Sequence, residues 1–199
     1  MRYRDLLDSE FEKFRLDPPS DQLRLLAIYA EEVDRWNRKI NLTALSAQAM
    51  VRRLIVEPIW IGRELGIQDS MIDVGSGNGS PAIPIAIGCA LQSCHLVESR
   101  SKRAVFLRHL RLTLGLKNTE VHRGRFEVVA PTLAPVQWVT LQAIAMNNVI
   151  VDAVRNVVTP TTTIVWITST RAESALTPFR TVTVPITGTR VFLYRLDLS

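Results

Sequence analysis

From residue 69 onward, short runs of β-forming residues alternate with runs that have the spacing of an amphipathic helix. This alternation limits the possible fold more than any other feature of the chain. A strand, a helix and a second strand in succession form a right-handed crossover, which makes the two strands parallel. The chain therefore predicts an α/β fold with a doubly wound, mostly parallel sheet. The predicted strands are Met71–Val74, Cys94–Val97, Thr119–Val121, Val136–Leu141 and Thr162–Ile167, and the predicted helices among them are Ala82–Leu91 and Ser101–Leu114.

The C-terminal part departs from this alternation. Phe179–Val184 and Arg190–Leu196 both have β-type composition, and only residues 185–189 separate them. A connection this short joins two antiparallel strands in a hairpin. We therefore expect the parallel sheet to end in an antiparallel C-terminal hairpin. This arrangement is typical of class I (Rossmann-like) methyltransferases, and dinucleotide dehydrogenases generally lack it.

The first part of the chain has helical periodicity without strand-like runs. An amphipathic helix is predicted over residues 21–38, and a second helical stretch over 47–65, which Pro58 should kink or break. We therefore predict a helical N-terminal extension over residues 1–66. The remaining residues, 67–199, form the predicted ligand-binding domain, and the two parts pack as one compact unit.

A glycine-rich loop connects the first predicted strand to the following helix. Gly75, Gly77 and Gly79 follow Asp73 at alternate positions, allow positive φ angles and let a ligand approach the backbone closely. A dinucleotide fingerprint would have Gly or Ala where Ser80 stands, and usually an apolar residue in place of Asp73. The pattern instead predicts a loop around the amino-acid part and ribose of S-adenosylmethionine, whose ammonium needs acceptors. We assign all five residues to cofactor binding.

Further candidate residues follow the next two strands. Glu98 ends the second predicted strand, where a carboxylate can accept hydrogen bonds from both ribose hydroxyls of a nucleoside. Glu98 alone does not distinguish the methyl donor from NAD, because both carry a ribose. After the third strand, Phe126 can lie against the adenine and Glu127 or its backbone can contact the adenine amino group, although core packing explains Phe126 equally well. We assign Glu98, Phe126 and Glu127 to the cofactor site.

Four segments carry a specific combination of motifs. Trp36–Thr43 has the sequence W-N-R-K-I-N-L-T, and Asp73–Ile87 contains D-V-G-S-G-N-G-S-P. They are followed by Leu96–Leu107 and by Arg125–Glu127. Together these segments resemble the RsmG/GidB family, the guanine-N7 methyltransferases of bacterial 16S ribosomal RNA. The resemblance is good over about residues 20–130.

The resemblance implies an enzyme that uses S-adenosylmethionine and methylates N7 of a guanine in 16S ribosomal RNA, alone or in the small-subunit particle. It also implies that Asn41 lies close to the acceptor guanine, which makes Asn41 the candidate catalytic residue. A guanine N7 carries a free lone pair, so the reaction needs no general base, and we expect catalysis by positioning and electrostatics. No catalytic triad is assigned.

The chain departs from the family on the acceptor side. Gln142 replaces an arginine after the fourth strand, and Thr168 and Ser169 replace a Lys-Gly pair. Upstream, Leu54, Glu57 and Pro58 stand where the family has the His, Asp and Ser of a His-x-x-Asp-Ser motif. These departures leave two alternatives open. One is a methyltransferase of the same fold that acts on another RNA or on a small molecule, and the other is a non-catalytic RNA-binding relative.

Charge and composition add expectations about partners. The net charge is +5, and between Glu98 and Arg125 there are eight Lys/Arg against two acidic residues. This excess suits a polyanion such as RNA, although a solvated helix face would look the same. No apolar run approaches the ~20 residues of a membrane helix. We expect a soluble, cytoplasmic protein without a metal site and favour a monomer.

Overall fold

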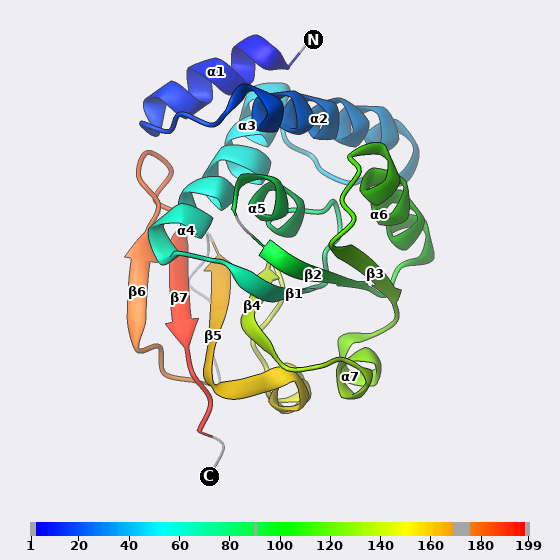
Figure 1. The fold of residues 1–199 in the computed structure, drawn as a ribbon, viewed down its shortest axis with the longest axis vertical. Helices are drawn as coiled ribbons and strands as arrows, with labels where there is room; N and C mark the ends of the chain where they lie inside the picture. Colours follow the sequence, from blue (N-terminus) through cyan, green and yellow to red (C-terminus); the bar gives the residue numbers. More distant parts are fainter. Residues whose placement is uncertain (1–2, 90, 169–175, 198–199) are drawn as a thin grey trace.

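Among the residues that the computed structural model describes, 3–89, 91–168 and 176–197, seven strands form one sheet in the order β3-β2-β1-β4-β5-β7-β6 (Figure 1). The first five strands pair in parallel, whereas β7 runs antiparallel to both of its neighbours, β5 and β6. This confirms the predicted doubly wound sheet with an antiparallel C-terminal hairpin. The strands are β1 (Asp69–Val74), β2 (Leu91–Glu98), β3 (Thr119–Arg123), β4 (Val136–Gln142), β5 (Val158–Thr168), β6 (Arg180–Thr183) and β7 (Arg190–Tyr194).

Helices cover both faces of the sheet. The α-helices are α1 (Arg4–Lys13), α2 (Ser20–Ile40), α3 (Ala47–Val51), α4 (Glu57–Leu65), α5 (Ala82–Gly88), α6 (Ser101–Thr113), α7 (Phe126–Val129) and α8 (Asn148–Val154). A π-helical turn, η1 (Arg52–Val56), joins α3 to α4, and short 3₁₀ turns, η2 (Ala130–Thr132) and η3 (Arg155–Val157), follow α7 and α8. The first six α-helices lie on one side of the sheet, and α7 and α8 lie on the other (Figure 1).

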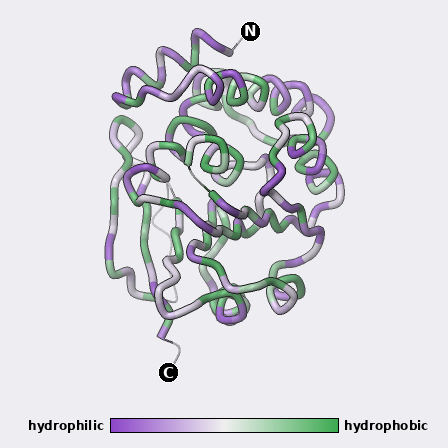
Figure 2. The backbone as a smooth tube through the Cα atoms, viewed as in Figure 1, coloured by the Kyte–Doolittle hydropathy of each residue, from purple (hydrophilic) through white to green (hydrophobic). Residues whose placement is uncertain are grey.

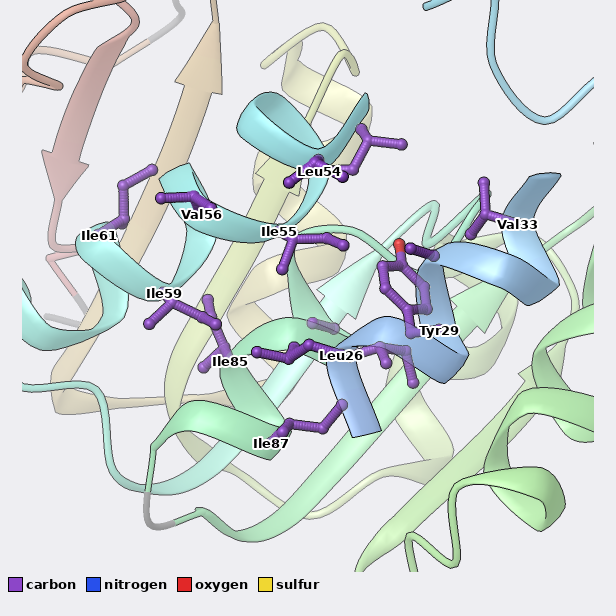
Figure 3. Close-up of a cluster of buried hydrophobic side chains, with 14 of the residues drawn as sticks. Leu26, Tyr29, Val33, Leu54, Ile55, Val56, Ile59, Ile61, Ile85 and Ile87 are labelled. Carbon is purple, nitrogen blue, oxygen red and sulfur yellow. The ribbon is translucent and has the colours of Figure 1, made fainter. Parts of the chain in front are cut away.

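Alternating side chains of each strand supply the two cores. Met71 of β1 packs into the cluster formed with the N-terminal helices, α5 and α6, whereas its neighbour Ile72 packs into the cluster formed with α7 and α8. Figure 3 shows the first cluster where Leu26 and Tyr29 of α2 meet Ile85 of α5. The N-terminal helices therefore share one hydrophobic core with the sheet. The division of the chain between residues 66 and 67 stays a prediction.

Helix α5 lies deepest among the helices. It is almost entirely apolar, as its colour in Figure 2 also shows. Most of its residues are buried, and it packs between the sheet and the helices α2 and α4. The helix is shorter than the predicted span of 82–91, because the backbone becomes extended at Cys89, and Leu91 already pairs with Asp69 of β1. The end of this helix was therefore predicted too late in the chain.

The helix does not break at Pro58, because a π-helical turn precedes it. Proline has no N–H to donate to the carbonyl of residue 54, and the π-helical turn over Arg52–Val56 accommodates this loss just before it. The stretch 47–65 consequently continues as one helical path through α3, η1 and α4. Helices α1, α7 and α8 were not predicted.

Candidate active site

Three adjoining cavities lie along the carboxyl edge of the parallel strands. The loop cavity, of about 430 Å³, is lined by the glycine loop, Glu98 and Gln142. The Phe126 cavity, of about 150 Å³, lies on one side of it, and the outer cavity, of about 510 Å³, lies on the other, next to α4 and the β6–β7 hairpin. Ile144 lines all three. In open α/β sheets ligands bind at this edge, so the three cavities form the candidate active site.

The glycine loop turns the chain sharply between β1 and α5. Gly75, Gly77 and Gly79 have φ angles of +71°, +51° and +93°, in the left-handed region that other residues rarely adopt. The amide N–H of Gly75 donates to the carbonyl of Val97 at 2.8 Å, which fixes the loop to the end of β2. A Cβ atom on Gly75 would lie 2.1 Å from Cδ1 of Ile144, so this position also leaves no room for a side chain.

Asp73 lies beneath this loop and is 1% exposed. Its Oδ1 accepts a hydrogen bond from Oγ1 of Thr140 at 2.7 Å, whereas Oδ2 finds no donor among the described residues. Burial raises the pKa of Asp73 to about 7, and the nearby Glu98 adds to this rise, against the hydrogen bonds from Thr140 and Ser76. Asp73 is not among the described residues that line the three cavities.

Glu98 lies at the end of β2 in the wall of the loop cavity and is 4% exposed. Its Oε2 accepts a hydrogen bond from the amide of Gly77 at 2.9 Å, and Oε1 accepts one from the amide of Arg100 at 2.7 Å. These bonds hold the carboxylate rigidly in place. Each oxygen keeps a second acceptor site for the hydroxyls of a ligand.

Ser80 closes the loop cavity on the α5 side. Its Oγ donates to Oε1 of Gln142 at 3.2 Å, and its amide donates to Oδ1 of Asn78 at 3.0 Å. The carbonyl of Asn78 in turn accepts a hydrogen bond from the hydroxyl of Tyr29 at 3.1 Å. The helix α2 therefore helps to position the glycine loop.

Phe126 and Glu127 lie in the wall of the Phe126 cavity, at the start of α7. Phe126 is 4% exposed and packs with Val97 and Ile144, so it serves both the core and the cavity wall. Glu127 is partly exposed, and its Oε1 lies 3.8 Å from the guanidinium of Arg125. The structure thus brings both predicted residues to a small, mainly apolar cavity next to the loop cavity.

Asn41 ends helix α2 with a φ of +48° and is exposed. Its carbonyl accepts a hydrogen bond from Arg103, and its neighbour Leu42 lines the loop cavity, but Asn41 itself is not among the described lining residues. The segment is shaped by Asn37, whose Oδ1 accepts from the amides of Leu42 and Thr43 at 2.6 and 2.8 Å. Asn41 therefore lies at the rim of the loop cavity.

The outer cavity contains residues for which no role was predicted from the sequence. Glu57, Arg53 and Trp166 line it together with Thr189, which precedes β7. The only sign of this site in the sequence was the set of family departures: Leu54 and Gln142 line both this cavity and the loop cavity, and Glu57 and Thr168 line this one. Ser169 lies outside the described residues.

The basic stretch that begins after Glu98 runs along helix α6. Lys102 and Arg108 are exposed, whereas Arg103 lines the loop cavity and donates to the carbonyl of Asn41 at 3.2 Å. The stretch therefore flanks the candidate active site with cationic side chains. Within the described part of the chain, no helix has the length and hydrophobicity needed to span a membrane.

Comparison with known proteins agrees with this geometry. A family model, GidB, described as rRNA small subunit methyltransferase G, matches residues 22–185. A relative named ribosomal RNA small subunit methyltransferase G from Chloroflexus aggregans is 36% identical over 129 residues, which are 62% of this chain and 54% of the relative. One of the same name from Cellvibrio japonicus is 36% identical over 119 residues, 57% of this chain and 54% of the relative. The chain thus spans about half the length of these curated relatives.

Solved structures support the fold. The O-methyltransferase from Bacillus cereus, in complex with SAH, superposes with a TM-score of 0.56 and 19% sequence identity, over 72% of this chain and 67% of that chain. Because the family model covers most of the sequence and the fold agrees, the chain belongs to the GidB family, rRNA small subunit methyltransferase G.

Proposed function

We propose that this protein is an S-adenosylmethionine-dependent methyltransferase that methylates N7 of a guanine in 16S ribosomal RNA. Membership of the GidB family supports the reaction class. The observation that carries the proposal is the junction of the three cavities at Ile144. Two of them accommodate a nucleoside, and the third offers space for an acceptor beside it.

The residues of the loop cavity and the Phe126 cavity fit the methyl donor. The Glu98 carboxylate lies beside the glycine loop, and each of its oxygens keeps an acceptor site that a ribose hydroxyl can use. Phe126 and Val97 supply apolar walls for an adenine, and Glu127 supplies a polar rim. Oδ2 of the buried Asp73 carboxylate accepts no hydrogen bond from the described residues, which favours a cationic ligand above it. Gly75, Gly77, Gly79 and Ser80 shape the backbone around that ligand.

Methyl transfer to N7 requires a positioned base and no proton removal. The protein contributes orientation and a fixed electrostatic environment. Asn41, at the rim of the loop cavity, contacts the acceptor nucleotide, and the cationic side chains of α6 contact RNA phosphates. The substrate is 16S ribosomal RNA or the small-subunit particle, and the protein acts in the cytoplasm as a monomer. Residues 67–199 form the donor-binding domain, and residues 1–66 form its helical extension.

One observation favours a second candidate, a methyltransferase of the same fold with a different acceptor. Gln142, Leu54 and Thr168 stand in the cavity walls where the family usually has Arg, His and Lys, so Arg53 is the one cation among the described residues of the outer cavity. A changed acceptor would leave the donor side intact. A non-catalytic RNA-binding relative would have no need of either cavity.

The proposal is tested by a tritiated-methyl transfer assay with ribosomal RNA and small-subunit particles that lack guanine-N7 methylation. We expect label in the 16S RNA and its recovery as 7-methylguanine. Donor binding without transfer to either substrate would contradict the ribosomal acceptor and favour the second candidate. The absence of both donor binding and transfer would contradict the enzymatic function.

A further inference from the structure

Glu57 is a buried carboxylate with one oxygen that accepts no hydrogen bond from the described residues. The residue is 2% exposed. Oε2 accepts from Oγ1 of Thr189 at 2.9 Å, whereas Oε1 finds no donor among the described residues, and Nε of Arg53 lies 3.8 Å from Oε1. An unfilled acceptor in a buried carboxylate is costly, so this geometry points to a donor that comes from a ligand.

The carboxylate lies in the wall of the outer cavity, whose volume of about 510 Å³ falls within the range of small-molecule sites. Trp166 and Ile167 supply apolar walls beside it. The outer cavity shares Leu54, Gln142, Ala143 and Ile144 with the loop cavity. A planar base in the outer cavity therefore lies directly beside the place proposed for the methyl donor.

Among the bases, guanine suits this carboxylate. Its Watson–Crick edge carries two adjacent donors, N1–H and the N2 amino group, and an ionised carboxylate is a pure acceptor. Adenine has an acceptor at N1 and would face Glu57 with a repulsive lone pair. The N7 atom lies on the opposite edge of guanine, so an acid that holds the Watson–Crick edge leaves N7 free.

We propose that Glu57 binds the Watson–Crick edge of the acceptor guanine in the outer cavity, with N7 directed toward the loop cavity. This inference rests on the proposed function and adds the residue that selects the base. In the reaction, the N7 lone pair forms a bond to the methyl carbon while the carbon–sulfur bond breaks and its electron pair stays on sulfur. The base gains a positive charge, which the Glu57 carboxylate stabilises.

The test combines one substitution in the protein with one in the RNA. Inosine keeps N1–H and N7 but lacks the N2 amino group, so it removes one of the two donors that Glu57 accepts. We measure kcat/KM for the wild type and for Glu57→Gln on RNA that carries guanosine or inosine at the methylated position. For the wild type, kcat/KM should be about tenfold or more lower on the inosine RNA than on the guanosine RNA. For Glu57→Gln, kcat/KM on the guanosine RNA should be about tenfold to a hundredfold below the wild-type value, with little further loss on the inosine RNA.

Matched variants separate base recognition from structure. Glu64→Gln removes an acid from the same helix, but Glu64 is partly exposed and pairs with Arg180, so this variant should retain full activity. Thr189→Val removes the hydroxyl that holds Oε2 and tests the support of the carboxylate. Affinity for S-adenosylhomocysteine should be unchanged in Glu57→Gln, which shows that the variant is folded.

The possible outcomes are distinct. A wild type that methylates no RNA contradicts the proposed function, and the inference with it. A wild type that methylates guanosine and inosine equally well overturns the role of Glu57 while the function stands, even if Glu57→Gln does not fold. Equal losses of kcat/KM on inosine in the wild type and in Glu57→Gln also overturn the role of Glu57, because the N2 amino group and the carboxylate would then act independently.

An independent cluster lies at the other end of the sheet, where strand pairing joins residues that are distant in the sequence. His95 of β2 lies opposite Glu120 of β3, with His122 two residues farther along. Nδ1 of His95 lies 3.1 Å from Nε2 of His122, and Oε2 of Glu120 lies 3.8 and 3.7 Å from these atoms. Zinc bonds of ~2.0–2.2 Å place tetrahedral ligand atoms roughly 3.3–3.6 Å apart, so the three atoms are already close to a zinc geometry.

We infer that His95, Glu120 and His122 bind a divalent cation of the zinc class, which fastens the edge strand β3 to β2. Calorimetry of the chelator-treated chain with zinc chloride should show one equivalent bound, weakened at least about tenfold in His122→Ala and in Glu120→Gln. His109→Ala is the matched control, since His109 pairs with Glu32 elsewhere and should not affect binding. The absence of saturable binding, or equal affinity in His122→Ala and the wild type, would overturn the site.

Discussion

The loop cavity and the outer cavity share a wall, but they are built from different parts of the chain and by different means. The loop cavity is formed mainly by the backbone of residues 75–80 and by Glu98, whose carboxylate is held by two amides. The outer cavity is formed by side chains from α4, the ends of β4 and β5, and the hairpin. A backbone site tolerates few substitutions at its glycines, whereas a side-chain site can change its ligand by single replacements. We therefore expect the donor to be general to the fold and the acceptor to depend on residues such as Glu57.

Gly75→Ala should have the largest effect, and only on the donor side. The new Cβ would lie 2.1 Å from Ile144, at a φ of +71°, so the loop must shift. We expect affinity for S-adenosylhomocysteine to fall at least about a hundredfold in a calorimetric titration. Gly115→Ala is the matched control: Gly115 has a similar φ of +65°, and no described atom lies within 4 Å of the Cβ it would gain. It should lower stability by about 1–2 kcal/mol and leave the affinity unchanged; equal affinities in both variants would contradict a backbone-built donor site.

Glu98→Ala tests the side-chain part of the donor site. The carboxylate accepts from ligand hydroxyls in addition to the amides of Gly77 and Arg100, so its removal should weaken S-adenosylhomocysteine binding about tenfold to a hundredfold. The dissociation constant is measured by calorimetry, with thermal unfolding as a check of the fold. An unchanged constant in a folded variant would rule out this role.

The outer cavity should give the enzyme a pH dependence of its own. Burial raises the pKa of Glu57, against the hydrogen bond from Thr189, the nearby hydroxyl of Thr187 and the nearby charges of Arg53 and Arg52. Guanine requires the ionised carboxylate, so kcat/KM for RNA should fall as the pH drops through this raised pKa, by up to about tenfold per pH unit. The Glu57→Gln variant should lack this fall.

The pH profile needs saturating donor, because Asp73 beneath the glycine loop also titrates, with a pKa of about 7. Donor affinity is measured over the same pH range as the control. A wild-type profile that is identical to the Glu57→Gln profile would show that the carboxylate does not take part in base binding.

The smallest effect concerns RNA phosphates outside both cavities. Lys102 and Arg108 are exposed on α6, and their joint replacement by Ala should make the slope of log K against log salt shallower by about one to two units. The exposed Arg63, which lies shortly before the start of β1, serves as the control and should leave the slope unchanged on replacement by Ala. An unchanged slope in the double variant would identify these charges as a solvated face.

The sequence predicted most of the fold because its signals are local. Alternating strand and helix patterns give the sheet, and the short connection at residues 185–189 gives the hairpin. Helix α1 was missed although Tyr3, Leu7 and Phe11 recur at helical spacing and are all buried. The end of α5 was missed because an apolar run does not show where a helix gives way to a strand.

The loop cavity and the outer cavity likewise differ in how far local sequence signals could predict them. The glycine loop is one continuous motif, and it was recognised with its neighbours Asp73 and Glu98. The contact between Glu57 and Thr189 joins residues 132 positions apart, and it exists because β7 pairs with β5 and brings the hairpin against α4. No local pattern reports such a contact. Residues of the outer cavity were therefore visible only as departures from a family.

In the proposed function, the glycine loop and Glu98 hold the sulfur-containing nucleoside and not a dinucleotide. The most direct test is a calorimetric titration of the purified chain with S-adenosylmethionine, S-adenosylhomocysteine and NAD under identical conditions. We expect one equivalent of each sulfur ligand to bind and no saturable binding of NAD. Binding of NAD that is tighter than that of both sulfur ligands would contradict the claim.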